Sequence, residues 1–478
     1  MSDIVNIIIN GKEVEAIEGS VLIDYLFKEN IDIPHFCYHP ALGTDGNCRM
    51  CMVEIEGSKR PQISCDTPVK AGMVVRTQGE NIEKVRRDIL ELELINHPVD
   101  CPTCDQAGEC KLQDYYMEGG FYESRLEAEN KNHAKKAVDL GKNVMLDQER
   151  CVLCTRCSRF TDEITHTNEL GIFSRSDHSV ISTFPGKELE SDYSMNVVDL
   201  CPVGALTSKD FRFNQRVWFL ETFEAICSGC SRGCNIYVDH KKEKYKDDQI
   251  FRFRPRENLD VNGYFICDDG RLSYKDENDK RMSDALISQE LVSTKEAVTN
   301  IANLLHTHPN DILLLVSPFL SNEELAMFKD YANNNGSALS GYSPQYNDET
   351  FADDMLRTSD RSPNRAGMKA LGISEDKKQF EELLSQKKIV VIVENNYFET
   401  KQDLLDSKEV ILLSSNDTTL IKSADTVLPI ASFLEKDGSY TNIDDVTQHI
   451  KSTMRKNAPA GTLISLWQEI ESLSKEEA

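Results

Sequence analysis

The cysteines constrain this sequence more than any other residue type, because they occur in four separate groups. All fifteen lie within the first 267 residues, and residues 268–478 contain none. An odd number of cysteines with repeated C-x2-C spacing favours metal ligation over disulfide pairing. With His97 added to the second group, every cysteine belongs to a set of four candidate ligands. The groups are Cys37, Cys48, Cys51 and Cys65; Cys101, Cys104 and Cys110; Cys151, Cys154, Cys157 and Cys201; and Cys227, Cys230, Cys234 and Cys267.

Length and charge narrow the class of protein. A chain of 478 residues is long enough for about three or four domains. The net charge of −26 argues against a nucleic-acid partner, because phosphate binding needs clustered positive charge. The sequence contains no run of about 18 apolar residues, so we expect no transmembrane helix. The N-terminus does not resemble a signal peptide. We therefore expect a cytoplasmic chain, where thiols stay reduced.

The first cysteine group follows a predicted hairpin and helix. Residues 4–16 alternate around Asn10-Gly11, a pair typical of a two-residue hairpin turn. Ser20 is expected to cap a helix over residues 21–30. Four thiolates in the loop-rich segment that follows suit a [2Fe–2S] cluster. Their spacing is not the plant-type pattern, so a zinc site remains the alternative.

The second group contains one histidine. Residues 80–96 have helical periodicity and deliver the chain to His97, four positions before Cys101. A histidine at this position is more often a ligand than a surface residue. Three cysteines and one histidine also form a known structural zinc pattern, so zinc is an alternative here too.

The third group has the C-x2-C-x2-C run of bacterial ferredoxins, and Cys201-Pro202 supplies the fourth ligand. In a two-cluster ferredoxin, a second cluster would need cysteines at four further positions. All four are occupied by other residues, so the spacing predicts a single [4Fe–4S] cluster. These positions are Thr161, Ser191, Ser194 and Val197.

The fourth group, with 32 residues before Cys267, is another four-thiolate set for which zinc is the alternative. After it the pattern changes to apolar runs typical of buried strands, at 311–318, 387–395, 410–415 and 426–430. Between the first two runs, Ser321 and Gly336 predict the start and end of a helix. Alternating strands and helices predict an open α/β sheet. Residues 337–380 are polar and weakly patterned, and we expect a long loop there.

The chain has no G-x-G-x-x-G motif, no P-loop and no obvious flavin site. A polypeptide that can hold several redox centres without a substrate pocket is expected to carry electrons between partner subunits.

Several segments resemble one family. The hairpin, helix and cysteine loop resemble the β-grasp [2Fe–2S] domain that opens the 75-kDa iron–sulfur subunit of respiratory complex I. The segment HPVDCPTCDQAGEC resembles the [4Fe–4S] site of that family, which has one histidine and three cysteine ligands. The segment VNGYFICDDGRLSY resembles the [4Fe–4S] domain of molybdopterin oxidoreductases. Residues 362–372 and 428–442 resemble other parts of those enzymes.

The resemblance implies an α+β multidomain fold without a molybdenum site. The expected domains are a [2Fe–2S] ferredoxin-type β-grasp domain over 1–79, a [4Fe–4S] domain with one histidine and three cysteine ligands over 80–135, a one-cluster ferredoxin-like domain over 136–215, a molybdopterin-oxidoreductase-type [4Fe–4S] domain over 216–275, and a truncated, catalytically silent α/β domain over 276–478.

The resemblance also implies a function. Such a chain would relay electrons in a proton-translocating NADH–quinone oxidoreductase, as a peripheral subunit on the cytoplasmic side of the membrane. Electrons would come from an NADH- and FMN-binding subunit and leave toward ferredoxin-like and quinone-binding subunits. The order would be the [2Fe–2S] cluster, the Cys151 cluster and the His97 cluster, with the Cys227 cluster off the path. The chain itself would hold no catalytic residue.

Two alternatives remain. One is the diaphorase subunit of a soluble NAD-linked hydrogenase or formate dehydrogenase, which shares the first three modules. The other is a zinc-stabilised scaffold with no redox role, which would be colourless.

Overall fold

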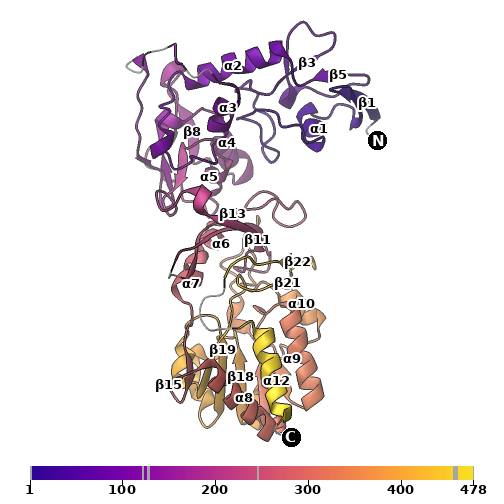
Figure 1. Ribbon diagram of the computed structural model, residues 1–478, viewed down its shortest axis with the longest axis vertical. Coiled ribbons are helices and arrows are strands. Elements are labelled where there is room, and N and C mark those ends of the chain that lie inside the picture. Colours follow the sequence, from indigo (N-terminus) through magenta and orange to yellow (C-terminus); the bar gives the residue numbers. More distant parts are fainter. Residues whose placement is uncertain are drawn as a thin grey trace. The chain divides into compact units, whose positions relative to one another are not determined.

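The structure is a computed structural model that describes residues 3–120, 123–125, 127, 130–244, 247–455 and 461–476. Two compact units divide the chain, Met1–Phe219 and Leu220–Ala478, and each is described by itself (Figure 1). No helix among the described residues is both long enough and apolar enough to cross a membrane.

The first unit begins with a five-stranded sheet of order β2-β1-β5-β3-β4. The predicted hairpin is confirmed, with Asn10-Gly11 at its turn. Helix α1 and this sheet share a buried core that includes Ile7, Leu26 and Val53. The bounds are β1 Ile4–Ile9, β2 Lys12–Ile17, α1 Leu22–Lys28, β3 Met52–Ile55, β4 Gln62–Ile63 and β5 Val74–Arg76.

The prediction that Ser20 caps α1 is wrong. Val21 is the N-cap residue, and no side chain caps the helix. The Ser20 hydroxyl instead donates to the carbonyl of Ile17, at the end of β2. A serine hydroxyl can satisfy a nearby backbone group as readily as a helix end, and here the preceding turn offers the nearer acceptor.

The rest of the first unit consists of short elements. Helix α2 confirms the predicted helix before His97, and a small sheet of order β10-β7-β6 lies further along the chain. The strands β8 and β9 form a separate hairpin. The bounds are α2 Glu80–Leu94, α3 Lys111–Gly119, β6 Val138–Asp139, β7 Val144–Leu146, α4 Arg156–Arg159, β8 Leu170–Phe173, β9 Val180–Thr183, α5 Asn196–Leu200 and β10 Leu206–Ser208.

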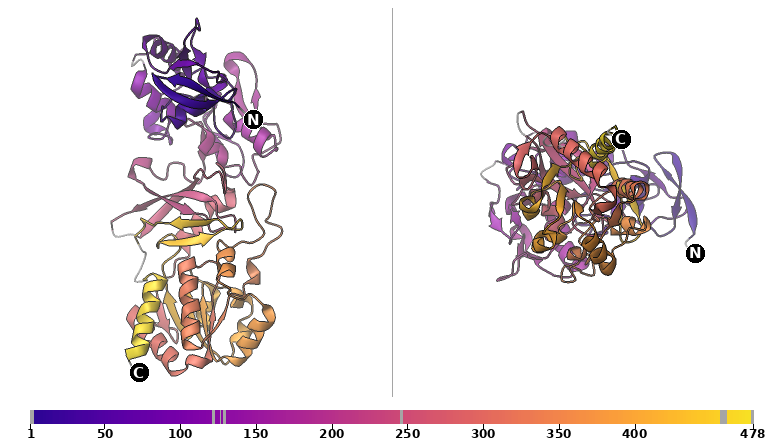
Figure 2. Two further views of the ribbon diagram at one scale, coloured as in Figure 1. Left: turned by 90° about the vertical axis from the view of Figure 1, so that its right-hand side faces the viewer. Right: turned by 90° about the horizontal axis from the view of Figure 1, so that it is seen from below.

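The second unit begins with an antiparallel sheet of order β11-β12-β13, followed by two short helices. A hairpin near the end of the chain, β21–β22, returns to pack beside β11 (Figure 2). The side chain of Gln448 joins the two parts by donating to the Gly233 carbonyl over 2.9 Å. The bounds are β11 Glu221–Ile226, β12 Asn235–Lys242, β13 Asp248–Pro255, α6 Asp268–Leu272, α7 Tyr274–Asp279, β21 Gly438–Thr441 and β22 Thr447–Ile450.

The remainder of the second unit is a seven-stranded α/β sheet of order β15-β14-β20-β19-β18-β16-β17. The four predicted strands are confirmed as β16, β18, β19 and β20, and they run parallel to one another. β14 joins this group in the antiparallel direction at β20. The bounds are β14 Ala285–Ile287, β15 Glu290–Val292, β16 Ile312–Leu315, β17 Ala338–Ser340, β18 Ile389–Val393, β19 Glu409–Ser414 and β20 Thr426–Pro429.

Helices cover both faces of this sheet (Figure 1). Successive strand residues point to opposite faces, so Leu314 packs in one core and Leu313 in the other. Three helices contribute to the first core, α8 Thr294–Thr307, α9 Asn322–Asn335 and α12 Leu463–Glu476. Helix α11 Lys377–Gln386 contributes to the second. Ser321 and Gly336 are confirmed as the caps of α9.

The expectation of a long loop over 337–380 is wrong. This segment contains β17, α10 Arg365–Ala370 and the beginning of α11. β17 pairs in parallel with β16, and Arg365 forms ion pairs with Asp360 and Glu375. These contacts fix a segment whose local pattern is weak.

Candidate metal centres

The first cysteine set lies in the loops beside the five-stranded sheet, and all four cysteines are buried. The sulfurs of Cys37 and Cys48 are 3.4 Å apart, and the amide of Phe36 faces the Cys48 sulfur at 3.5 Å. A hydrogen bond with Cys65 lowers the pKa of Cys51 to about 7. Cys37 also interacts with Cys65, so the structure brings all four predicted residues together.

The second set converges on one cavity. His97, Cys101, Cys104 and Cys110 all line it, between the end of α2 and the beginning of α3. The other lining residues are largely apolar and include Leu94, Val99, Ala107 and Leu112. Burial lowers the pKa of His97 to about 4. The imidazole is therefore neutral at pH 7, as a metal ligand must be.

Gly204, which the sequence interpretation missed, closes this cavity from the third module. A Cβ atom at Gly204 would lie 2.3 Å from the Cys104 sulfur, so no larger residue fits beside the set. The amide of Lys111 donates to the Pro202 carbonyl over 3.0 Å and fixes the same approach. In the sequence, a glycine directly after Cys201-Pro202-Val203 is the signal that could have indicated this close approach.

The third set is formed by the turn before α4, which carries Cys151 and Cys154, by Cys157 within α4, and by Cys201 directly after α5. The amide of Leu153 faces the Cys151 sulfur at 3.4 Å. Thr155 adopts a left-handed conformation, φ 64°, which turns the chain between Cys154 and Cys157. Burial raises the pKa of Cys157 well above its usual value, and the thiols of Cys154 and Cys151 raise it further.

Packed side chains occupy positions that a second ferredoxin cluster would need. Thr161, Ser194 and Val197 are at most 2% exposed. The Thr161 hydroxyl donates to the Ser158 carbonyl over 3.0 Å. This part of the module is filled by ordinary core packing.

The fourth set lies in the second unit, and all four cysteines are buried. The amides of Gly229 and Gly270 face the sulfurs of Cys227 and Cys267 at 3.4 and 3.3 Å. A Cβ atom at Gly270 would lie 2.9 Å from the Cys227 sulfur. Burial raises the pKa of Cys234 well above its usual value, with Cys227 and Cys230 adding to the rise.

The loop that carries three of these cysteines is held by distant parts of the unit. The Ser231 amide donates to the Asp360 carbonyl, and the Ile443 amide donates to the Ser231 carbonyl, each over 2.8 Å. The Arg361 side chain donates to the Gly229 carbonyl over 2.8 Å. The surroundings of the fourth set are therefore assembled from residues far apart in the sequence.

Within the first unit, the three sets lie in series. Arg159, two residues after Cys157, donates to the Cys37 carbonyl, and Asn47, next to Cys48, donates to the Leu153 carbonyl over 3.0 Å, so the third set lies beside the first. The amide of Lys111, next to Cys110, donates to the carbonyl of Pro202, next to Cys201, over 3.0 Å, so the second set lies beside the third. The third set is the one in the middle.

The geometry of the candidate ligands bears on the choice between a single zinc ion and a cluster. Among the described residues, no three His, Cys, Asp or Glu side chains are close enough together to hold a single metal ion. Tetrahedral zinc needs all its sulfurs at about 2.3 Å from one atom. Buried thiols, peptide amides aimed at sulfur and glycines at the sulfur contact suit a cluster, which is larger than one ion.

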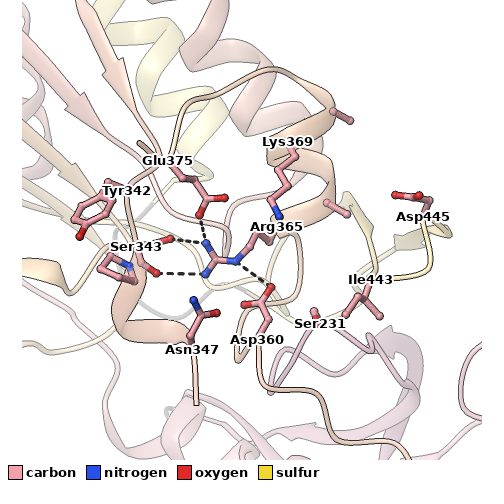
Figure 3. Close-up of a pocket in the computed structure, with 13 residues that line it drawn as sticks. Ser231, Tyr342, Ser343, Asn347, Asp360, Arg365, Lys369, Glu375, Ile443 and Asp445 are labelled. Atoms are coloured by element: carbon pink, nitrogen blue, oxygen red, sulfur yellow. Dashed lines mark hydrogen bonds and ion pairs between the residues drawn. The ribbon is translucent and has the colours of Figure 1, made fainter. Parts of the chain in front are cut away.

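A separate pocket of about 760 Å³ lies in the second unit, beside the ligand loop (Figure 3). The sequence interpretation did not predict it. Arg365 points into it but is satisfied, with its Nε donating to Asp360 over 3.0 Å and an ion pair to Glu375. Lys369 and Asp445 bring both signs of charge to the lining, which contains no cysteine or histidine among the described residues.

Family models match the chain in five consecutive segments. They are described as a 2Fe-2S iron-sulfur cluster binding domain (2–80), an NADH-ubiquinone oxidoreductase-G iron-sulfur binding region (86–125), an NADH-quinone oxidoreductase subunit 3 ferredoxin-like domain (141–207), a molybdopterin oxidoreductase Fe4S4 domain (220–279) and molybdopterin oxidoreductase (360–476). Each of the first four segments contains one complete set of predicted ligands. The mixed α/β content of the structure agrees with these matches.

Curated relatives carry consistent names. The NADH-ubiquinone oxidoreductase 75 kDa subunit of Reclinomonas americana is 37% identical over 74% of this chain and 52% of its own length. The mitochondrial NADH-ubiquinone oxidoreductase 78 kDa subunit of Neurospora crassa is 38% identical over 70% of this chain and 45% of its own length. The chain thus spans about half the length of the curated relatives it matches.

Among solved structures, an NAD+-reducing [NiFe]-hydrogenase chain is 28% identical, with a TM-score of 0.40, and the match covers 45% of this chain and 91% of that one. The names of the curated relatives and the order of the family models agree with the resemblance that the cysteine motifs indicated. The chain belongs to the 75 kDa iron–sulfur subunit family of NADH-quinone oxidoreductases.

Proposed function

We propose that this chain is an electron-transfer subunit of an NADH–quinone oxidoreductase. The observation that carries the proposal is that three sets of candidate ligands lie in one compact unit, with backbone and side-chain contacts joining the third set to both the first and the second. A chain that only needed metal for stability would have no reason to place three sets within electrostatic reach of one another.

The ligands are proposed set by set. Cys37, Cys48, Cys51 and Cys65 would hold one [2Fe–2S] cluster. Three [4Fe–4S] clusters would be held by His97 with Cys101, Cys104 and Cys110, by Cys151, Cys154, Cys157 and Cys201, and by Cys227, Cys230, Cys234 and Cys267. When bound, these clusters supply one-electron transfer, whereas the protein positions them, excludes water from them and sets the local charge.

The chain's own residues support such a role in three ways. Burial of most of the cysteines keeps water away from the sulfurs. Peptide amides at Leu153, Gly229 and Gly270 face sulfur and stabilise negative charge there. Neutral His97, in place of a thiolate, makes its site less negative and favours reduction relative to a four-cysteine site.

The partners belong to the proposal as well. By family, electrons would come from an NADH- and FMN-binding subunit and leave toward ferredoxin-like and quinone-binding subunits, on the cytoplasmic side of the membrane. The fourth set would be off this path and mainly structural, because the hydrogen bonds of its loop tie together distant parts of the second unit. The C-terminal α/β region would hold no molybdenum, since residues 268–478 contain no cysteine.

Metal analysis and low-temperature EPR of anaerobically purified, dithionite-reduced protein test the cluster assignment. About 14 iron atoms per chain are expected, with signals of both cluster types. Stoichiometric zinc without an EPR signal would contradict the redox function and leave a structural scaffold.

The relay is tested by Cys154→Ser in the assembled complex. We expect NADH-to-quinone electron transfer to be abolished, because the set in the middle of the series is damaged. Gel filtration of the complex is the control for assembly. An unchanged rate in a correctly assembled complex would refute the proposed order.

A further inference from the structure

Arg156 lies between two of the proposed cluster sites. It is the first residue of α4, within the C-x2-C-x2-C run, and occupies a position between the ligands Cys154 and Cys157. Its side chain is 8% exposed, which is rare for an arginine without a charged partner. Such a burial calls for a physical explanation.

The guanidinium group joins the backbones of two ligand loops. Nη1 donates to the carbonyl of Leu200 over 3.2 Å, and Nη2 donates to the carbonyl of Tyr38. Leu200 directly precedes Cys201, and Tyr38 directly follows Cys37. One side chain therefore bridges a ligand of the third set to a ligand of the first.

The charge of Arg156 is not neutralised locally. Within the part of the chain that the structure describes, no carboxylate forms an ion pair with it, and its Nε has no hydrogen-bond partner. Arg150 is a similarly buried arginine with different surroundings. Its Nη2 lies 2.7 Å from Asp100 Oδ2, and its Nε lies 3.4 Å from Asp147 Oδ2. One buried arginine is thus part of a cluster with carboxylates, whereas the other carries an uncompensated positive charge.

Three candidate ligands lie within electrostatic reach of Arg156. Burial lowers the pKa of its guanidinium, and the thiols of Cys154, Cys201 and Cys37 act in the opposite direction. Charges interact several times more strongly in a protein interior than in water. A guanidinium remains protonated throughout the range in which proteins are stable.

We propose that Arg156 is a positioning residue whose uncompensated charge raises the reduction potentials of both the Cys37 set and the Cys151 set. This inference rests on the proposed function. Reduction adds one negative charge to each site, and a fixed positive charge between the two sites stabilises both reduced forms. The same residue holds the two ligand loops at a constant separation through its two carbonyl contacts.

The test uses the purified chain of 478 residues and redox titration followed by EPR. In Arg156→Gln, a neutral side chain keeps a hydrogen-bond donor, and both midpoint potentials are expected to fall. The expected fall corresponds to about a tenfold weaker reduction equilibrium at each site, which is about 59 mV for one electron. Arg156→Lys keeps the charge, and its potentials are expected to stay close to those of the unaltered chain.

Lys111→Met is the matched control. This lysine directly follows the ligand Cys110 but is exposed, so solvent screens its charge. Neither potential is expected to move. A shift as large as that of Arg156→Gln would mean that removing any nearby cation has the same effect, and would overturn the inference.

The outcomes separate this inference from the proposed function. Absence of iron and of EPR signals in the unaltered chain contradicts the function itself. Full iron with both signals, but unchanged potentials in Arg156→Gln, overturns the role of Arg156 and leaves the function intact. A shift at only one site overturns the shared role. If Arg156→Gln fails to retain iron, the potentials of Arg156→Lys are the test. A fall of both potentials in Arg156→Lys would show that the charge at this position does not determine them, and would overturn the inference.

Discussion

The first unit and the α/β sheet of the second unit are stabilised in different ways. In the sheet, strands of four to six residues, β16 and β18–β20, are covered on both faces by apolar cores, and helices α8, α9 and α12 each have 14 residues. In the first unit, the third candidate set lies among strands of two or three residues and helices of four or five. Elements this short are not stable by themselves.

This contrast indicates which part of the chain depends on metal for its stability. We infer that the short elements around the three ligand sets depend on ligand bonds for their stability, because metal binding can contribute folding free energy directly. The α/β sheet has its own hydrophobic core and needs no such bonds. Removal of metal and single substitutions in the two regions test this inference.

Removing iron with a chelator under reducing conditions should have the largest effect. The short elements α3, β6, β7, α4, α5 and β10 are expected to lose most of their protection from amide hydrogen exchange, whereas the strands β16 and β18–β20 keep theirs. Hydrogen exchange with mass spectrometry measures both regions in one sample. Equal protection of the first unit before and after chelation would contradict this inference. A chelated sample reloaded with zinc is the control, and it should regain part of the protection.

Cys230→Ser should reduce stability without reducing electron transfer. Loss of one ligand from the fourth set is expected to lower the yield of assembled complex by at least about tenfold, since even residues outside the ligand shell can cost this much in metal affinity. Turnover per assembled complex should be retained. Loss of turnover in intact complex would place the fourth set on the electron path, as Cys154→Ser is expected to do for the third.

Glu277→Gln should change how the stability of the second unit depends on pH. Glu277 lies in α7, and burial raises the pKa of its carboxyl group to about 7, whereas Arg281 opposes the rise. The carboxylates of Glu394 and Glu435 also face it and raise its pKa further. Its buried Oε2 has no hydrogen-bond partner among the described residues.

The sign of this effect follows from linkage. An acid whose pKa is higher in the folded state stabilises the fold while protonated, and this contribution is lost as pH rises from the unfolded value, about 4.3, to about 7. The loss is about 3–4 kcal/mol. Glu277→Gln should remove this dependence and make the unit more stable at pH 8.

Fluorescence of the buried Trp467 during urea unfolding measures this, in a Trp218→Phe background, because the chain has only two tryptophans. Glu290→Gln, at an exposed position in β15, is the control and should leave the pH dependence unchanged. A pH dependence that survives in Glu277→Gln would assign it to another group.

Ser293→Ala should have the smallest effect. Ser293 caps α8 and accepts from the Glu296 amide over 3.2 Å, and loss of such a cap costs about 1 kcal/mol. The same tryptophan assay applies. Thr299→Ala removes a hydroxyl from the middle of the same helix, where it donates to the Lys295 carbonyl, and should be near neutral. Equal effects of the two changes would show that the cap contributes nothing specific.

Much of the fold could be predicted where the determinants are local. Asn10-Gly11 requires a tight hairpin turn, and Ser321 and Gly336 mark the ends of a helix by their own chemistry. The apolar runs at β18 and β19 predict buried strands because they have no polar face. The structure also brings each predicted ligand set together, although the ligand roles themselves remain predictions.

The rest depends on contacts between residues whose positions the local sequence does not determine. Ser20 could not be excluded as a cap without knowing that the Ile17 carbonyl lies closer. The burial of Arg156 follows from the approach of Tyr38, 118 positions away. The closeness of Gly204 to Cys104 likewise depends on how two modules pack, which no local pattern contains.

The hairpin β21–β22 has a consequence for how the protein is made. The loop of the fourth set is completed by Ile443 and Gln448, so its surroundings do not exist until residues this late in the sequence have left the ribosome. The three sets of the first unit are complete in sequence once Cys201 and Gly204 have been synthesised. Domains generally fold as units during synthesis, N-terminal first. Under the proposed function, the first unit can therefore receive its clusters during translation, whereas the fourth set can receive its cluster only after Gln448 has been synthesised.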